Sequence, residues 1–117
     1  MKKIELTEYE HCILLADYLN LLQTQGKIKM FSHIPNSTYT TSWNQKRKNK
    51  RMGVAPGVPD YMILTNNGLV FIEMKKEKKG VVSQEQQDWI DNLMESGYGA
   101  YVARGFNEAK DIVDRYF

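Results

Sequence analysis

The sequence is poor in the residues that form disulfide bonds or bind zinc. It contains one cysteine, Cys12, and two histidines, His11 and His33. A single cysteine excludes an intramolecular disulfide framework, and this small set argues against a structural zinc site. No apolar run approaches the roughly 18 residues that span a bilayer, and three glutamates within the first ten residues interrupt any signal-peptide core. We therefore expect a cytoplasmic protein that does not enter a membrane.

The length and composition indicate one ordinary domain. The chain has 117 residues, and no repeat, low-complexity tract or change in composition marks a second unit. Hydrophobic residues make up 42% and charged residues 26% of the chain, a balance typical of a globular protein with one core. We therefore treat residues 1–117 as a single domain.

Positive charge is concentrated, although the net charge is only +2. Two groups of basic residues occur. The first contains no acid, and the second contains one, Glu77. They are Lys46, Arg47, Lys48, Lys50 and Arg51, and then Lys75, Lys76, Lys78 and Lys79. Such clusters suit a surface that faces a polyanion, and the alternative is a solvated basic loop.

Hydrophobic periodicity and turn residues predict an α/β domain, a mixed sheet of about four strands flanked by helices. The expected elements are a helix over 7–25, a strand over 28–34, a hairpin of 61–64 and 69–72, a helix over 83–96, a strand over 98–103 and a helix over 107–116. Residues 37–58 look like loop, with room for a short helix before Gly53.

Helical spacing also predicts which side chains of the helices are buried. In the first helix the predicted core stripe is Tyr9, Cys12, Ile13, Ala16 and Leu19. In the helix over 83–96 the predicted buried side consists of Trp89, Ile90, Leu93 and Met94. Apolar residues of the first helix that lie partly off the stripe are left for an interface; they are Leu14, Leu15, Leu21 and Leu22.

The predicted hairpin brings three charged residues together. Asn67-Gly68 favours a type I′ turn, in which both central residues need positive φ. If these two form the turn, position 66 faces 69, position 62 faces 73 and position 60 faces 75. Directly opposed residues, and residues two apart on a strand, point to the same side of a sheet. Asp60, Glu73 and Lys75 then share one face at the end of the hairpin away from the turn.

This group of residues suits metal-assisted phosphodiester hydrolysis. Two carboxylates close together repel each other unless a divalent cation such as Mg²⁺ or Mn²⁺ lies between them. The metal stabilises negative charge in the transition state and activates water, and a lysine beside it orients that water. The alternative is a surface ion pair between Asp60 and Lys75. Two features argue against it: Glu73 follows a buried strand directly, and Pro59 holds the chain extended before Asp60.

Several segments together resemble one nuclease family. Residues 57–61 (GVPDY) and 71–75 (FIEMK) resemble the signature of the PD-(D/E)XK nucleases, and more narrowly that of the virus-type replication-repair nuclease (VRR-NUC) family. Residues 80–89 (GVVSQEQQDW) resemble the family's block of glycine, serine, glutamine and tryptophan. Residues 34–36 and 97–102 resemble its upstream asparagine segment and its later strand. The resemblance spans about residues 8 to 115 and implies a restriction-endonuclease-like fold.

The resemblance also implies roles for individual residues. Asp60 and Glu73 would bind Mg²⁺ or Mn²⁺ together with the main-chain carbonyl of Met74, and Lys75 would orient the attacking water. The family also has a glutamate on the first helix that reaches the metal site directly or through water. In this chain it corresponds to Glu10 or Glu8. Glu10 fits the pattern better, although it also has capping-box spacing from a threonine at position 7.

Further positions carry two interpretations each. Gln86 matches the family glutamine and would belong to the site, but it too has capping-box spacing, from Ser83. Residues 46–51 would contact DNA phosphates, with Asn36 adding contacts to sugars or bases. Tyr39 and Trp43 could contribute in the same way, and Trp43 is equally compatible with a place in the core.

The sequence therefore predicts a Mg²⁺-dependent deoxyribonuclease, and the resemblance implies products with 5′-phosphate and 3′-hydroxyl ends. By resemblance we expect a homodimer acting on branched DNA such as four-way junctions, encoded by a phage or mobile element and acting in the host cytoplasm. One alternative is a non-catalytic DNA-binding module on the same fold. Another is a small protein whose basic loop binds RNA, for which no interleaved aromatic signature appears.

Overall fold

The computed structural model describes residues 4–35 and 40–117. Four helices and four strands form the described part of the chain. In order they are α1 (Glu8–Thr24), β1 (Ile28–His33), α2 (Trp43–Met52), β2 (Tyr61–Thr65), β3 (Gly68–Lys75), α3 (Gln84–Glu95), β4 (Gly99–Arg104) and α4 (Phe106–Asp114). The predicted α/β class is confirmed, and the short helix before Gly53 is a full ten-residue element. No helix in the described ranges is long and apolar enough to cross a membrane.

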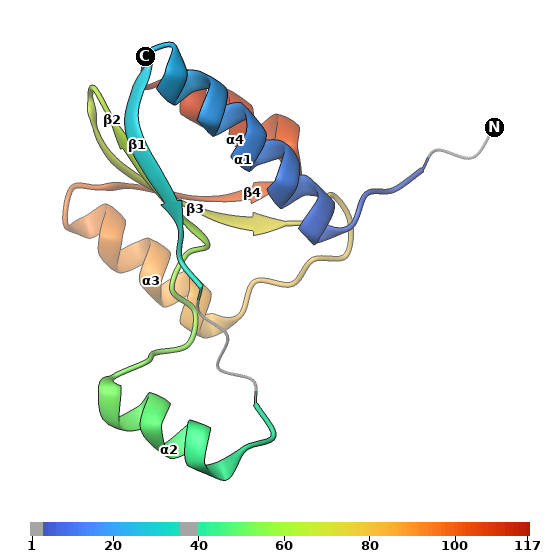
Figure 1. The fold of residues 1–117 in the computed structure, drawn as a ribbon, viewed down its shortest axis with the longest axis vertical. Helices are drawn as coiled ribbons and strands as arrows, with labels where there is room; N and C mark the ends of the chain where they lie inside the picture. The colour runs from blue at the N-terminus through green and yellow to red at the C-terminus, as the bar shows by residue number, and fades with distance from the viewer. Residues whose placement is uncertain (1–3, 36–39) are drawn as a thin grey trace.

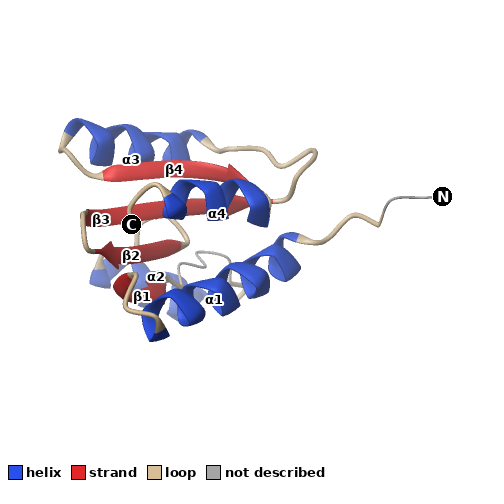
Figure 2. Cartoon of the chain, turned by 90° about the horizontal axis from the view of Figure 1, so that it is seen from above, coloured by secondary structure: helices blue, strands red, loops and turns tan. Residues whose placement is uncertain are grey.

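The strands form one mixed sheet in the order β1-β2-β3-β4. The pairs β1–β2 and β2–β3 are antiparallel, whereas β4 lies parallel to β3. Helices α1 and α4 cover one face of the sheet, and α3 lies on the opposite face beside β4 (Figures 1 and 2). Strand β3 is an inner strand, with β2 on one side and β4 on the other.

The hairpin turn differs from the predicted turn by one residue, yet the predicted face is correct. Thr65 pairs with Gly68, so Asn66 and Asn67 are the central residues of the turn. Neither has positive φ; in this turn only Gly68 does, at 124°. The type I′ turn was therefore wrong. Tyr61 pairs with residue 72, so position 60 lies opposite 73 rather than 75. This shift of two residues preserves the alternation of faces.

The core face of α1 is rotated from the predicted stripe. Leu15, Leu19 and Leu22 are fully buried together with His11, whereas Tyr9 and Ile13 are exposed. Apolar residues lie around most of this helix, so periodicity alone could not choose the buried side. Leu15 and Leu22 are therefore core residues and are not available for an interface.

Helix α3 buries fewer side chains than predicted, and α2 buries none. In α3 only Ile90 is buried, while Trp89 and Met94 remain exposed, because the helix rests on β4 with one narrow side. Helix α2 has no buried residue and stands away from the sheet (Figure 1).

Candidate functional site

The strongest cluster of charged side chains lies where β3 ends and β2 begins. Asp60 precedes β2, and one of its carboxylate oxygens accepts a hydrogen bond from the main-chain N–H of Met74 at 2.8 Å. Glu73 and Lys75 project from β3 on the same face, with the Lys75 ammonium 3.6 Å from Glu73 Oε2. The predicted convergence of Asp60, Glu73 and Lys75 is therefore present, and the ion pair joins Lys75 to Glu73 rather than to Asp60.

Glu73 is an unusual carboxyl group because it is almost completely buried. Only 3% of it is exposed, and Lys75 beside it is 8% exposed. Burial, followed by the charge of Asp60, raises the pKa of Glu73 to about 8, although Lys75 acts in the opposite direction. The buried Glu73 thus lies beside the half-buried Asp60, with the Lys75 ammonium as the nearby positive charge.

Gln86 connects this cluster to α3. Its Nε2 donates to Glu73 Oε2 at 3.1 Å, while its Oε1 accepts the N–H of Ser83 at 3.0 Å. The Ser83 hydroxyl in turn accepts the N–H of Gln86, which completes a capping box. One amide thus caps the helix and contacts the buried carboxylate, and a role of Gln86 in the reaction stays a prediction.

The loop before Asp60 is held against the start of α3. Gly57 has φ of +86°, and a Cβ there would lie 2.5 Å from the backbone carbon of Glu85. The Trp89 indole donates to the carbonyl of Pro56 at 3.2 Å. Only glycine permits such close backbone contact in this conformation. The glycine and the tryptophan therefore determine where Asp60 lies relative to α3.

His33 also belongs to the surroundings of Asp60, and the sequence analysis did not assign it a role. It is the last residue of β1, its ring packs edge-on against Tyr61, and the next residue, Ile34, donates its N–H to the Asp60 carbonyl. His33 lines both hollows beside Asp60; the one of about 370 Å³ also contains Glu73 and Gln86. A histidine ending a strand that pairs with the Asp60 segment is the signal that could have identified it.

The first helix places Glu8, not Glu10, toward the cluster. The Glu10 carboxylate accepts the N–H of Thr7 at 3.0 Å, and the Thr7 hydroxyl accepts the N–H of Glu10, forming a capping box. This bond lowers the pKa of Glu10. Glu8 instead lines the hollow of about 420 Å³ that contains Asp60, and its charge contributes to the raised pKa of Glu73. The structure thus does not bring Glu10 to Asp60 and Glu73.

The residues predicted to contact nucleic acid lie apart from this cluster. Lys46, Arg47, Lys48, Lys50 and Arg51 are all on α2 and exposed. Trp43, the first residue of α2, is 75% exposed, so its alternative assignment to the core was wrong. Asn36 and Tyr39 lie outside the described residues.

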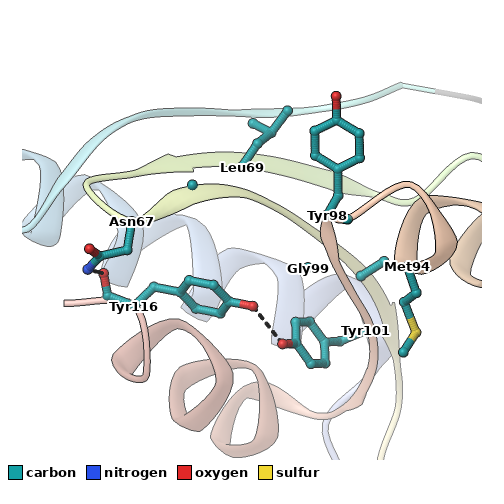
Figure 3. Close-up of a pocket in the computed structure, with 10 residues that line it drawn as sticks. Asn67, Leu69, Met94, Tyr98, Gly99, Tyr101 and Tyr116 are labelled. Atoms are coloured by element: carbon teal, nitrogen blue, oxygen red, sulfur yellow. Dashed lines mark hydrogen bonds between the residues drawn. The ribbon is translucent and has the colours of Figure 1, made fainter.

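Another hollow, of about 510 Å³, lies at the opposite end of the sheet, beside the hairpin turn (Figure 3). Its lining includes Leu69, Tyr98 and the hydrogen-bonded pair Tyr101–Tyr116, whose hydroxyl oxygens are 2.6 Å apart. The described residues that line it include no carboxylate. This hollow therefore lacks the carboxylates that a divalent cation prefers.

Oxygen donors at the Asp60 cluster fit a hard divalent cation. Asp60 and Glu73 supply carboxylates, and in a strand the C=O of a residue points to the same side as its N–H. Since the Met74 N–H points to Asp60, its carbonyl is directed to that edge as well. The described residues hold no group of three His, Cys, Asp or Glu side chains that could bind a metal ion. A third protein ligand would therefore come from the main chain.

Comparisons with known proteins agree with this geometry. The model of the VRR-NUC domain family matches residues 7–107. A solved structure described as a VRR_NUC domain protein is 25% identical, with a TM-score of 0.74, over 97% of this chain and 89% of that chain. A comparison with curated proteins gave no match. Because the family match includes α1, the Asp60 loop, the end of β3 and the start of α3, the chain belongs to the VRR-NUC domain family, a family of nucleases.

Proposed function

We propose that this protein is a divalent-metal-dependent deoxyribonuclease that hydrolyses phosphodiester bonds. The observation that supports this most directly is the burial of Glu73 beside Asp60, with a single ammonium, that of Lys75, within reach. An unneutralised pair of carboxylates is costly inside a protein, and families retain such pairs where a cation or substrate completes them. The family membership supports nuclease chemistry for this arrangement.

Mg²⁺ or Mn²⁺ would be held by Asp60, Glu73 and the carbonyl of Met74. When bound, the ion would stabilise the charge that develops on the phosphate and make a water molecule more acidic. The chain's own residues have separate tasks. Met74 N–H holds the Asp60 carboxylate in place, and Gln86 Nε2 holds that of Glu73. Such support keeps the ligands oriented when the cation is exchanged.

Lys75 is positioned to orient a water molecule and to stabilise negative charge. Its ammonium is buried and compact, and it lies 3.6 Å from Glu73 Oε2, on the side of the sheet that also carries Asp60. An ammonium held in a site that excludes most water interacts more strongly with developing charge than one on the surface. This supports a role in the reaction rather than in general phosphate attraction.

The direct experiment is cleavage of supercoiled plasmid by the purified chain. Mg²⁺ or Mn²⁺ should support conversion to nicked and linear forms, and excess EDTA should abolish it. The products should carry 5′-phosphates, which a ligase reseals. Glu73→Ala, which should remain folded, serves as the inactive control. Cleavage by the wild-type protein that persists in excess chelator would refute metal dependence.

A non-catalytic DNA-binding module is the competing function. Against it, all three residues of the signature, Asp60, Glu73 and Lys75, are present and converge. Binding of plasmid without cleavage in Mg²⁺, Mn²⁺ or Co²⁺ would support the module instead.

We further propose that the protein acts as a homodimer on branched DNA. Severing two strands at a defined place requires two sites in a constant relation, and two-fold dimers are the commonest soluble oligomers. On the face of the sheet that carries Asp60, three apolar side chains remain exposed beside α3: Met30, Met62 and Leu64. Met30 pairs with Leu64 across the strands, so the three form one strip. An interface on this strip would place two sites on one shared surface.

Light scattering would test this assembly. Leu64→Lys, on the sheet, should give a monomer, whereas Met52→Lys, at an exposed position of α2, should leave the dimer intact. The dimer should make paired cuts in each four-way junction, and it should cut junctions in preference to linear duplex. A wild-type monomer, or equal cleavage of both DNAs, would refute the proposal.

A further inference from the structure

Helix α2 lies in the segment that connects β1 to the Asp60 loop of the candidate active site. The N–H of Ile34, which follows β1, donates to the carbonyl of Asp60, which precedes β2, at 2.6 Å. The chain leaves the sheet at this hydrogen bond, forms α2 and returns to the same hydrogen bond. Seven residues separate Met52 from Asp60. A long polyanion such as DNA could therefore contact α2 and extend toward the carboxylates, whereas α2 itself lies apart from them.

The helix is stable only through local interactions. The Ser42 hydroxyl accepts the N–H of Gln45 at its start, and Gly53 ends it with φ of 85°. No residue of α2 is buried, and its ten residues include five cations and no acid. An isolated helix of this length is marginal in water, and its like charges repel one another. A polyanion would remove that repulsion, which makes a nucleic acid backbone the complementary partner.

The basic side chains are not spread evenly around α2. At about 100° per residue, Lys46, Arg47, Lys50 and Arg51 all lie within roughly 80° of Trp43. Lys48 and Met52 lie farther around the helix, at about 140° and 180°. Gln45 and Asn49 occupy the rest of that second side and bond to each other at 2.6 Å. The helix thus presents one face with four cations and one aromatic ring.

Trp43 is the unusual member of this face. It is 75% exposed, and the Lys46 ammonium lies 4.9 Å from the centre of its ring. A cation over one face of the indole holds the ring and leaves its other face open. Phosphate contacts need no aromatic group, whereas an exposed indole offers a flat surface on which an unpaired base can stack.

We infer that this face of α2 recognises DNA in which base stacking is interrupted. Its cations contact the phosphates of one duplex arm, and Trp43 stacks on a base whose face is open at a branch point or gap. Trp43 is thus a specificity-determining residue. The inference rests on the proposed function and adds to it how a branched substrate is distinguished from linear duplex.

Binding measured without cleavage tests this directly. Three labelled DNAs are used in EDTA: a blunt linear duplex, a duplex with a one-nucleotide gap, and a four-way junction. Trp43→Ala should weaken binding of the gapped and branched DNAs by about tenfold and that of the blunt duplex by less than about twofold. Trp43→Phe should keep most of the preference. Met52→Ala is the matched control, because Met52 is 70% exposed on the opposite side of the same helix.

Tryptophan fluorescence gives an independent measurement. The gapped DNA should quench the wild-type emission, and most of this quenching should be lost in Trp43→Phe, whose remaining tryptophan is Trp89. If Trp43→Ala weakens all three DNAs equally, or none, or if Trp43→Phe is quenched as strongly as the wild type, stacking by Trp43 is refuted. Plasmid cleavage in Mg²⁺ is scored separately, so a failure of the nuclease proposal remains distinguishable from a failure of this one.

The two sides of α2 also allow a test with charge held equal. Lys50→Ala should lower the log–log salt slope of duplex binding by about 0.9, the effect of one lost phosphate contact. Lys48→Ala removes the same charge from the other side and should leave the slope nearly unchanged. Equal slopes for the two variants would refute the assignment of the binding face.

Discussion

The side-chain amide of Gln86 donates to the buried carboxylate of Glu73 at 3.1 Å while it also caps its own helix through Ser83. This relationship aligns α3 with the end of β3. A shift of the helix by one residue would lose both the cap and the contact. The candidate site and the start of α3 are therefore stabilised by the same side chain.

The raised pKa of Glu73 predicts an unusual dependence of stability on pH. The pKa is about 8 in the folded protein, against about 4.3 in an unfolded chain. As pH rises through this interval, the unfolded state releases a proton that the folded state keeps, so the free energy of unfolding falls. In EDTA, Glu73→Gln should remove this fall and be more stable than the wild type above pH 8. Urea unfolding at pH 5 and pH 8.5 measures it.

Mg²⁺ should reverse the loss of stability that the wild type shows at high pH in EDTA. Because the cation needs ionised carboxylates, it should raise the free energy of unfolding of the wild type at pH 8 and have little effect on Glu73→Gln. Glu95→Gln, a change at an exposed position of α3, is the control and should respond as the wild type does. Equal stabilisation of all three proteins would mean that Mg²⁺ binds elsewhere.

Substitution of Lys75 should affect turnover more than DNA binding. Lys75→Ala should lower kcat by about 100-fold or more with little change in affinity for duplex. Lys75→Arg should restore little, because a planar guanidinium does not fit where a compact ammonium is buried. The neighbouring Lys76→Ala, at an exposed position, should leave kcat nearly unchanged. A Lys75→Ala defect confined to binding would place Lys75 among the phosphate contacts.

Substitutions of the two glutamates in the first turn of α1 should affect different properties, one stability and the other activity. Glu10→Ala should lower the free energy of unfolding through loss of the capping box and leave kcat unchanged. Glu8→Ala should lower activity with little effect on stability, since its charge reaches the Asp60 cluster. Thermal unfolding and single-turnover cleavage measure the two properties, and the reverse pattern would restore Glu10 to the site.

Two glycines with the same φ distinguish crowding from backbone strain. Gly57 and Gly53 have φ of 86° and 85°, but only at Gly57 would a Cβ meet backbone atoms within 4 Å. Gly53→Ala should cost about 1 kcal/mol from the left-handed conformation alone. Gly57→Ala should cost more and also reduce cleavage, because it separates the Asp60 loop from α3. Similar losses of stability, with full activity for both, would contradict this.

The sequence predicted the shared face of Asp60 and Glu73 for a robust reason. Alternation in a strand depends on odd or even spacing, so a register error of two residues leaves every side chain on its predicted side. The turn itself was predicted less well, because the preference of Asn67-Gly68 for positive φ was outweighed by Thr65, whose hydroxyl bonds Asn67 N and Gly68 O.

Long-range contacts explain the remaining differences. His11 is buried because its Nδ1 accepts the N–H of Phe106, at the start of α4, where Gly105 provides no side-chain cap. Phe106 is 95 residues away from His11 in the chain, so no local sequence pattern predicts this contact. The phase of α1 follows from this contact and from the leucines beneath it. Local signals of capping, by contrast, identified Ser83 with Gln86 correctly.

The hydrogen bond between Ile34 and Asp60 has a consequence for how such a protein can diversify. The segment between them begins and ends at one point, so the closure of that loop is already provided by the sheet. Doubling the length of a flexible loop costs only about 0.6 kcal/mol. The helix-bearing excursion could therefore be lengthened, shortened or exchanged while the strands that carry the acidic residues keep their register. If α2 selects the substrate as proposed, substrate preference and hydrolytic chemistry would be carried by separable parts of one small chain.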